Sequence, residues 1–327
     1  MKDRFGRTIN YLRISVTDRC NLRCIYCMPE EGVLPLGHEE ILRYEEIVRI
    51  VDVARELGIN HIRLTGGEPL VRKDLIDLVK WIRTAGIPDI SMTTNGTLLA
   101  PLVKPLKDAG LGRVNISLDT LDPEKFRRIT RRGSIHDVLS GIRAAVDSGL
   151  NPVKLNMVVI AGLNSTEIQD MARLSLEMPV HVRFIEVMPI GPDPTVARDG
   201  RVTLEEIVAE VKKVGELEPV PHPDGAGPAE SFKIKGGEGT VGFIAALSRP
   251  FCTECNRLRL TADGKIRPCL ASDLEIDVKG ILRSGQTDEE IRRLVKDAFA
   301  RALELKPQAH HLASYEAQAR RMCQIGG

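Results

Sequence analysis

The chain has 327 residues, 43% of them hydrophobic, so it is long enough for one large domain or two with a sizeable core. Its 46 Lys and Arg residues nearly balance 45 Asp and Glu residues, and the net charge is +1. Without a strong net field, nucleic acid and membrane surfaces are poor candidate partners, so any anion site must be local. The N-terminus lacks the apolar core of a signal peptide and no run approaches about 18 apolar residues, so we expect a cytoplasmic protein.

Strand and helix patterns alternate over the first two thirds of the chain. The predicted strands are 11–16, 61–65, 90–94, 113–118, 153–160 and 180–187. The predicted helices are 44–57, 74–84, 101–109, 134–148 and 165–177. Such alternation predicts an α/β fold with a parallel sheet and right-handed crossovers.

Polar and apolar residues alternate within these strands. Arg13 and Ser15 alternate with Leu12 and Ile14, and the same period recurs in three further strands. A sheet covered by helices on both faces would be apolar throughout. We therefore predict a partial (β/α)6 TIM-like barrel with a wet, basic interior, although polar residues at solvent-exposed strand ends remain the alternative for any single position.

Beyond residue 190 the pattern changes. Segments 191–200 and 219–228 are expected to be irregular, 204–214 and 288–303 helical, and 231–235 with 240–246 a β-hairpin. We expect the barrel to occupy residues 1–217 and a C-terminal α+β extension, residues 218–327, to close it.

Three cysteines follow the first strand directly. Cys20, Cys24 and Cys27 have the spacing C-x3-C-x2-C. One disulfide would leave the third thiol unpaired, which favours metal ligation. Structural zinc takes four closed protein ligands, whereas three thiolates on a 4Fe-4S cubane leave one iron open. The spacing leaves an iron-sulfur cluster, zinc and uncoordinated thiols as alternatives.

A second group, Cys252, Cys255 and Cys269, has the spacing C-x2-C-x13-C. Structural zinc, completed by Cys323 or a distant histidine, is the alternative to a second cluster. Arg257 and Arg259 follow on one face of a strand pattern. Two guanidinium groups beside a metal site suit an anionic ligand.

The first cysteine motif has an aromatic residue before its third cysteine, and it resembles the motif of the radical S-adenosylmethionine (SAM) superfamily. The G-G-E-P run after the second predicted strand is similar to the element of that superfamily that contacts SAM. Four segments narrow the resemblance to the GTP 3′,8-cyclase family: S-V-T-D-R-C-N-L-R-C-I-Y-C-M-P, L-T-G-G-E-P-L-V-R, F-C-x2-C-N-R-L-R-L-T-A-D-G with R-P-C-L, and the terminal M-C-Q-I-G-G. This resemblance implies a lyase of molybdenum cofactor biosynthesis. Its reaction would begin with hydrogen abstraction at C3′ of GTP and end in (8S)-3′,8-cyclo-7,8-dihydroguanosine 5′-triphosphate.

The resemblance also implies roles for individual residues. Cluster 1 would be held by Cys20, Cys24 and Cys27 and cluster 2 by Cys252, Cys255 and Cys269; the first triad, Arg257 and Arg259 would be catalytic. SAM would contact Tyr26, Gly67, Ser117 and Met188. GTP and the tail would involve Arg13, Arg63, Thr94, Lys154, Arg183, Arg257, Arg259, Gly326 and Gly327. His61 replaces a lysine of many relatives, and Cys323 is expected to be a spare thiol.

The implied partners are GTP, an electron donor and a cyclic pyranopterin monophosphate synthase that receives the product, with no nucleic acid or membrane; a homodimer is one arrangement the resemblance allows. Two other functions stay open on the sequence. One is a radical SAM peptide-modifying maturase with an auxiliary cluster, and the other is a zinc-stabilised nucleic-acid-binding or scaffold protein.

Overall fold

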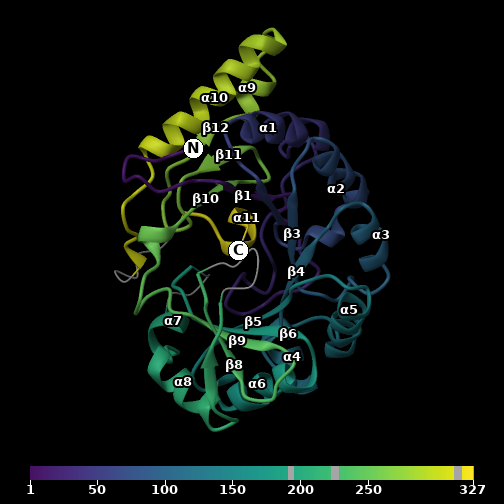
Figure 1. Ribbon diagram of the computed structural model, residues 1–327. Coiled ribbons are helices and arrows are strands. Elements are labelled where there is room, and N and C mark those ends of the chain that lie inside the picture. Colours follow the sequence, from purple (N-terminus) through teal and green to yellow (C-terminus); the bar gives the residue numbers. More distant parts are fainter. Residues whose placement is uncertain (191–194, 222–227, 313–318, 327) are drawn as a thin grey trace.

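A computed structural model describes residues 1–190, 195–221, 228–312 and 319–326. Within these residues, twelve strands form one sheet in the order β12-β11-β10-β1-β2-β3-β4-β5-β6-β9-β8-β7. The sheet curves around the middle of the molecule, where the C-terminus lies (Figure 1). Its central strands run parallel: β1 (Tyr11–Ser15), β2 (His61–Thr65), β3 (Asp89–Thr94), β4 (Arg113–Ser117), β5 (Val153–Val159) and β6 (Val180–Glu186).

Helices cover the outside of these strands (Figure 1). They are α1 (Tyr44–Glu56), α2 (Leu75–Thr84), α3 (Val103–Asp108), α4 (Pro123–Thr130), α5 (Ile135–Asp147) and α6 (Ile168–Glu177), with short 3-10 turns η1 (Pro69–Val71) and η2 (Ser165–Glu167). The sequence did not predict α4, although Asp122 caps it by accepting a hydrogen bond from the Lys125 amide, with Pro123 at its first position. The other five helices are confirmed.

The alternation within the strands sorts their side chains between two environments. Leu12, Ile14, Ile62 and Leu64 are fully buried under the outer helices. Arg13, Arg63 and Thr65 of the same strands point to the opposite, inner face. The partial β/α barrel is therefore confirmed, and its inner wall carries polar groups.

The C-terminal part of the chain extends both edges of the barrel sheet. At one edge β9 (Thr240–Ile244) pairs parallel with β6 and antiparallel with β8 (Glu230–Ile234), which pairs with β7 (Leu217–Pro219). At the other edge β10 (Arg257–Leu260) pairs parallel with β1, followed by β11 (Lys265–Arg267) and β12 (Ile276–Asp277). The predicted hairpin is confirmed as β8 and β9, and the alternation of Arg257 and Arg259 with Leu258 and Leu260 is confirmed as β10, whereas β11 and β12 were not predicted.

The remaining elements are α7 (Thr195–Asp199), α8 (Leu204–Lys212), η3 (Cys252–Glu254), α9 (Lys279–Leu282), α10 (Asp288–Glu304) and α11 (Met322–Ile325). The expectation that 191–200 is irregular is wrong for α7, because Ala197 packs against Ile160 and Val187 and stabilises a helical turn. Most of the irregular segment expected at 219–228 lies outside the described residues. The division after residue 217 stays a prediction.

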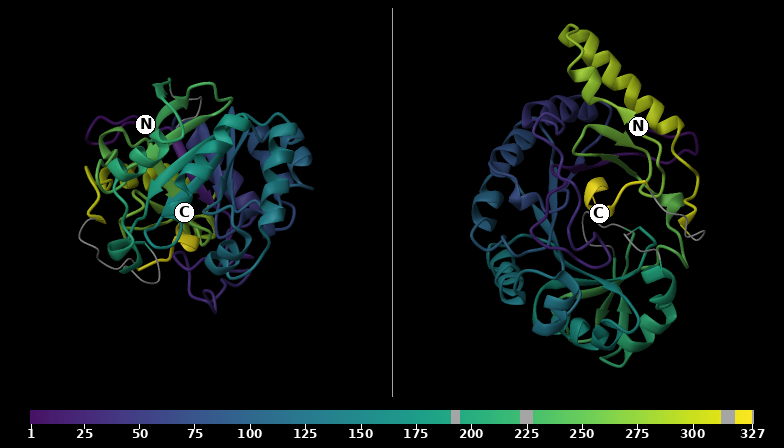
Figure 2. Two further views of the ribbon diagram at one scale, coloured as in Figure 1. Left: turned by 90° about the horizontal axis from the view of Figure 1, so that it is seen from below. Right: turned by 180° about the vertical axis from the view of Figure 1, so that it is seen from behind.

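Helix α10 lies beyond the barrel wall and packs on α1, β11 and β12, while the C-terminus returns to the middle (Figure 2). Thr287 caps α10 by accepting a hydrogen bond from the Glu290 amide. Among the described helices, none combines the length and the apolar character that a bilayer crossing requires.

Candidate active site

Both cysteine triads open onto one cavity of about 340 Å³ inside the barrel. The first triad lies on the loop after β1, at the C-terminal ends of the parallel strands. The second lies at the opposite end, because Cys255 comes just before β10, and the first residue of β10 is level with Tyr11 at the start of β1. Cys269 follows β11, which runs antiparallel to β10 and so returns to that end. A five-residue strand spans about 17 Å, so the triads form two separate sites with room for a molecule between them.

The loop of the first triad is held by close backbone packing. A side chain at Gly67 would overlap the carbonyl oxygens of Asp18 and Arg19, so only glycine allows the turn after β2 to pack against this loop. The Leu22 amide points at the Cys20 sulfur, with 3.4 Å between nitrogen and sulfur. Burial raises the pKa of Cys20 to about 11, so a metal cluster must displace its proton on binding.

The distribution of the cysteines fits clusters better than single metal ions. Among the described residues, no three His, Cys, Asp or Glu side chains are placed to hold one ion. Zinc draws its thiolates to about 2.3 Å from a single centre, whereas a cubane binds each thiolate at a different iron and keeps the sulfurs apart. Three thiols around an open space therefore suit a 4Fe-4S cluster.

The second triad has a different electrostatic environment. Burial tends to raise the pKa of Cys255, but the charges of Arg257 and Lys306 outweigh it and lower this pKa to about 7. The Arg257 guanidinium lies 4.9 Å from the centre of the Phe251 ring, which holds it beside the triad. Cys255 is therefore closer to the thiolate form that metal ligation needs.

Arginine side chains line the wall between the triads. Arg13, Arg63, Arg183 and Arg259 are buried and Arg257 is half-buried, and all five line the cavity. Burial and the neighbouring Arg257 lower the pKa of Arg259 to about 10, and burial with the charge of Arg63 lowers that of Arg183 to about 9. Closely spaced buried cations repel one another, so this wall requires a polyanionic ligand to balance it.

Lys154 differs from the predicted substrate arginines, because it is not among the residues that line the cavity. Burial and the charges of Arg183 and Arg63 lower its pKa to about 6. His61 does not line the cavity either, as far as the chain is described; its ring nitrogen contacts Asp89, which also pairs with Arg113. A phosphate contact at His61 would have to compete with Asp89.

Family models match two stretches of the chain: the radical SAM superfamily over residues 14–175 and "Molybdenum Cofactor Synthesis C" over residues 180–312. The chain is 55% identical to the GTP 3′,8-cyclase of Moorella thermoacetica and 52% identical to that of Heliobacterium modesticaldum, with 100% of each chain covered. It belongs to the GTP 3′,8-cyclase family. The fold also resembles the crystal structure of Streptococcus suis SuiB bound to S-adenosylmethionine, with a TM-score of 0.59, 15% identity, and coverage of 83% of this chain and 63% of that one.

Membership of the radical SAM superfamily implies a 4Fe-4S cluster and SAM, and makes the chain an enzyme. The predicted SAM contacts Tyr26, Gly67, Ser117 and Met188 all line the cavity. The Tyr26 hydroxyl donates a hydrogen bond to Asp119. Thr94 also lines the cavity, and its hydroxyl donates to Glu68 at 2.7 Å.

In this cyclase-family chain the C-terminal tail reaches the predicted substrate arginines. Arg259 Nη1 donates to the carbonyl oxygens of Ile325 at 3.0 Å and Gly326 at 2.5 Å. Gly326 has a φ of 72°, and a side chain there would come within 2.6 Å of the Thr65 methyl carbon. The conformation and the space both require glycine. Gly327 lies outside the described residues.

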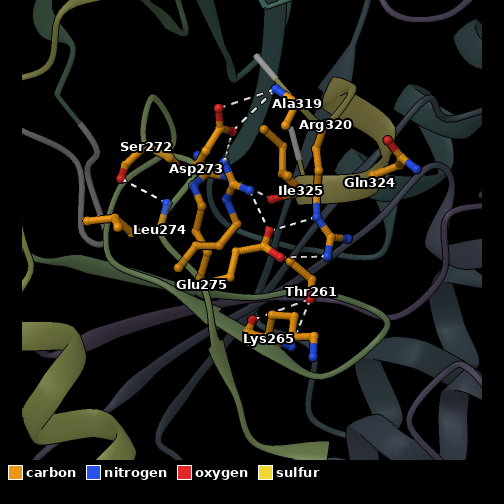
Figure 3. A network of polar contacts seen from close by, with 12 residues as sticks. Thr261, Lys265, Ser272, Asp273, Leu274, Glu275, Ala319, Arg320, Gln324 and Ile325 are labelled. Atoms are coloured by element: carbon orange, nitrogen blue, oxygen red, sulfur yellow. Dashed lines mark hydrogen bonds and ion pairs between the residues drawn. The ribbon is translucent and has the colours of Figure 1, made fainter.

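An ion-pair network anchors the segment that leads to this tail (Figure 3). Arg320 pairs with Asp263 at 2.8 Å and with Glu275 at 2.7 Å, and the Ala319 amide donates to Asp273. The same tail carries Cys323, whose thiol interacts with that of Cys27 and raises the pKa of Cys27. Cys323 was expected to be a spare thiol, but it is buried against the first triad.

Several cavity residues were not predicted. The side-chain oxygens of Tyr11, Thr93, Asn115 and Asn156 are buried without a hydrogen-bond partner in the described part of the chain, and all four residues line the cavity. Their alternation along the strands was a usable signal. Lys306 and His310 also line the cavity, but they lie outside any strand or helix and carried no sequence signal. Unsatisfied buried oxygens indicate a polar ligand.

Proposed function

We propose that this chain cyclises GTP to (8S)-3′,8-cyclo-7,8-dihydroguanosine 5′-triphosphate in the first step of molybdenum cofactor biosynthesis. The observation that carries the proposal is one cavity with a cysteine triad at each end and buried cations between them. In that arrangement the first triad offers a site to SAM and the second offers a site to a nucleobase. The cations between them balance the charge of a triphosphate. The names of the full-length relatives support the choice of GTP.

In this proposal Cys20, Cys24 and Cys27 hold the first 4Fe-4S cluster, which with SAM supplies an adenosyl radical that removes the C3′ hydrogen of the ribose. The SAM-contacting residues are Tyr26, Gly67, Ser117 and Met188. Their positions at the C-terminal ends of the barrel strands, beside the first triad, support this assignment.

At the other end, Cys252, Cys255 and Cys269 would hold a second 4Fe-4S cluster, which would offer a binding site to the guanine. The triphosphate is bound by the five arginines of the cavity wall and by Lys154, which lies behind them, with Thr94 as a further contact. The arginines are Arg13, Arg63, Arg183, Arg257 and Arg259. Opposite charges in a buried wall interact strongly because little water screens them. The wall also excludes water from a carbon radical at C3′.

The tail contributes Gly326 and Gly327 to the closed site. This role of the tail is supported by two hydrogen bonds, which Arg259 donates to the carbonyl oxygens of Ile325 and Gly326. Arg259 would then orient the tail and the substrate together, which explains why a glycine, with its exposed backbone, is suited to this position.

An external electron donor must reduce the first cluster, and the cyclised nucleotide would pass to a cyclic pyranopterin monophosphate synthase. A cytoplasmic location and a possible second copy of the chain belong to the same proposal. A peptide-modifying reaction is less well supported, because a wall of buried cations matches a triphosphate better than a neutral peptide backbone.

The test is anaerobic reconstitution with iron and sulfide, followed by dithionite, SAM and each nucleoside triphosphate in turn. We expect about eight irons per chain. Cyclised nucleotide and stoichiometric 5′-deoxyadenosine should form with GTP alone. A preparation that holds both clusters and cleaves SAM, yet gives no cyclised nucleotide from GTP, would refute the proposed function.

A further inference from the structure

A buried lysine joins the two arms of the second cysteine triad. Lys306 follows α10 and is 2% exposed. Its ammonium donates to the carbonyl oxygens of Arg257 and Pro268, both at 2.7 Å, and its charge interacts with the thiols of Cys255 and Cys269. An ammonium group has three N–H donors, and Lys306 uses two of them on the backbone beside this triad.

The partners of Lys306 lie on different arms of the triad. Arg257 comes two residues after Cys255, and Pro268 comes directly before Cys269. The ammonium therefore fixes how far apart these two cysteines are held. An isolated buried lysine is costly, and its place here is maintained by the polar groups it contacts.

The third cysteine is tied to the same segment by Arg7. Its Nη1 donates to the Cys252 carbonyl oxygen at 2.6 Å, and its Nη2 donates to the Pro307 carbonyl oxygen at 2.7 Å. An ion pair between Arg7 Nε and Asp3, at 2.6 Å, holds the guanidinium in place. The segment that begins at Lys306 is thus bonded directly to the backbone beside Cys255 and Cys269, and it is linked to Cys252 through Arg7.

Charge gives Lys306 a second effect. A cubane with three thiolate ligands is anionic, and reduction adds another electron to it. A cation held nearby in a buried site interacts more favourably with the more negative, reduced state. Lys306 is the neighbour of both Cys255 and Cys269, and its charge acts on both.

We propose that Lys306 is a positioning residue of the second triad: its ammonium fixes the spacing of the Cys255 and Cys269 arms and raises the reduction potential of the cluster held there. The inference rests on the second cluster of the proposed function. It adds a residue that shapes this cluster without being a ligand to it.

The test uses the full-length chain with Cys20, Cys24 and Cys27 replaced by serine, so that only the second cluster can form. In this background we compare Lys306→Met, Lys306→Gln, Lys306→Arg and a control, Lys235→Met, whose exposed side chain pairs with Glu216 away from the cavity. Circular dichroism checks folding. Iron per chain and the midpoint potential of the cluster, from EPR-monitored redox titration, are the readouts.

We expect both neutral variants to shift the potential to more negative values, while Lys306→Arg and Lys235→Met stay close to the parent. Loss of iron from a folded neutral variant, with iron retained in Lys306→Arg, also supports the positioning role. Full iron content with an unchanged potential in either folded neutral variant overturns the proposal for Lys306 and leaves the second cluster intact. A parent chain that binds no iron refutes the second cluster itself.

Discussion

Lys154, which lies behind the cavity wall, tests how the buried cations respond to a polyanion. Its side chain is fully buried on β5, its charge faces Arg183 on β6, Arg63 on β2 and Arg113 on β4, and the Asp89 carboxylate partly offsets them. Burial and these like charges lower its pKa to about 6. We therefore expect the free chain to carry Lys154 as a neutral amine at pH 8.

The size of the effect follows from this pKa. At pH 8, two units above a pKa of about 6, roughly 1% of Lys154 is protonated. A bound triphosphate favours the charged amine and raises the pKa, so binding takes up close to one proton. The sign is fixed: affinity falls as the pH rises from about 6 to the pKa of the bound state.

Other groups contribute little to this uptake at pH 8. The terminal phosphate of GTP is already ionised, because its last pKa is near 6. The pKa of Arg183, about 9, leaves it largely protonated before binding. The pKa of His181 is lowered to about 4 by burial and by Lys154 and Arg183, so it stays neutral.

The assay is calorimetric titration of GTP into the cluster-loaded chain, without SAM, in two buffers of different ionisation enthalpy. We expect an uptake near one proton per GTP for the wild-type chain and for Lys235→Met, and an uptake near zero with weaker binding for Lys154→Met. Equal proton uptake by the wild-type chain and Lys154→Met would show that Lys154 is not the group that responds to the triphosphate.

Three further substitutions separate the parts of the site. Cys24→Ala should abolish SAM cleavage, so any 5′-deoxyadenosine above background speaks against its role. Arg257→Ala should keep uncoupled SAM cleavage and lose cyclised product, and loss of both activities would contradict a role confined to the substrate. Arg320→Met removes the cation shared by Asp263 and Glu275 and should lower product formation about tenfold, with iron content unchanged. An unchanged rate would mean that the ion pairs do not hold the tail in place.

The central barrel could be predicted from the sequence because its signal is local. Each strand alternates polar and apolar residues, and most predicted boundaries fall within two residues of those observed; the predicted strand 61–65 coincides with β2. The alternation at Arg257 and Arg259 indicated β10, but not that it pairs with β1, because pairing over such a sequence separation cannot be read from periodicity. The chain lacked an equally clear signal for β11 and β12, which are three and two residues long and depend on pairing with their neighbours.

In the site, too, features with a local sequence signal were predicted and features that depend on contacts between distant segments were missed. The cysteine triads and the arginines of β10 have a recognisable spacing, so they were predicted, and both triads open onto one cavity. Lys306 and Arg7 were missed because their contacts join segments that are 49 and 245 residues apart. Cys323 was predicted to be a spare thiol, with a transient ligand role as the alternative, because it lies four residues before the C-terminus; the anchored tail brings it to Cys27.

The parallel pairing of β1 with β10 accounts for the arrangement of the two sites. It sets Arg13 level with Arg259, so two of the proposed substrate cations lie side by side on neighbouring strands. It also places Cys255 before the start of one strand and Cys20 after the end of the other, at opposite ends of the same hydrogen-bonded ladder. A β-ladder is stiff, so the distance between the two triads is set by strand length rather than by loops. In the proposed reaction SAM is held at the first triad and GTP at the second. The fixed distance between the triads would then bring the ribose of GTP within reach of SAM along the cation-lined wall.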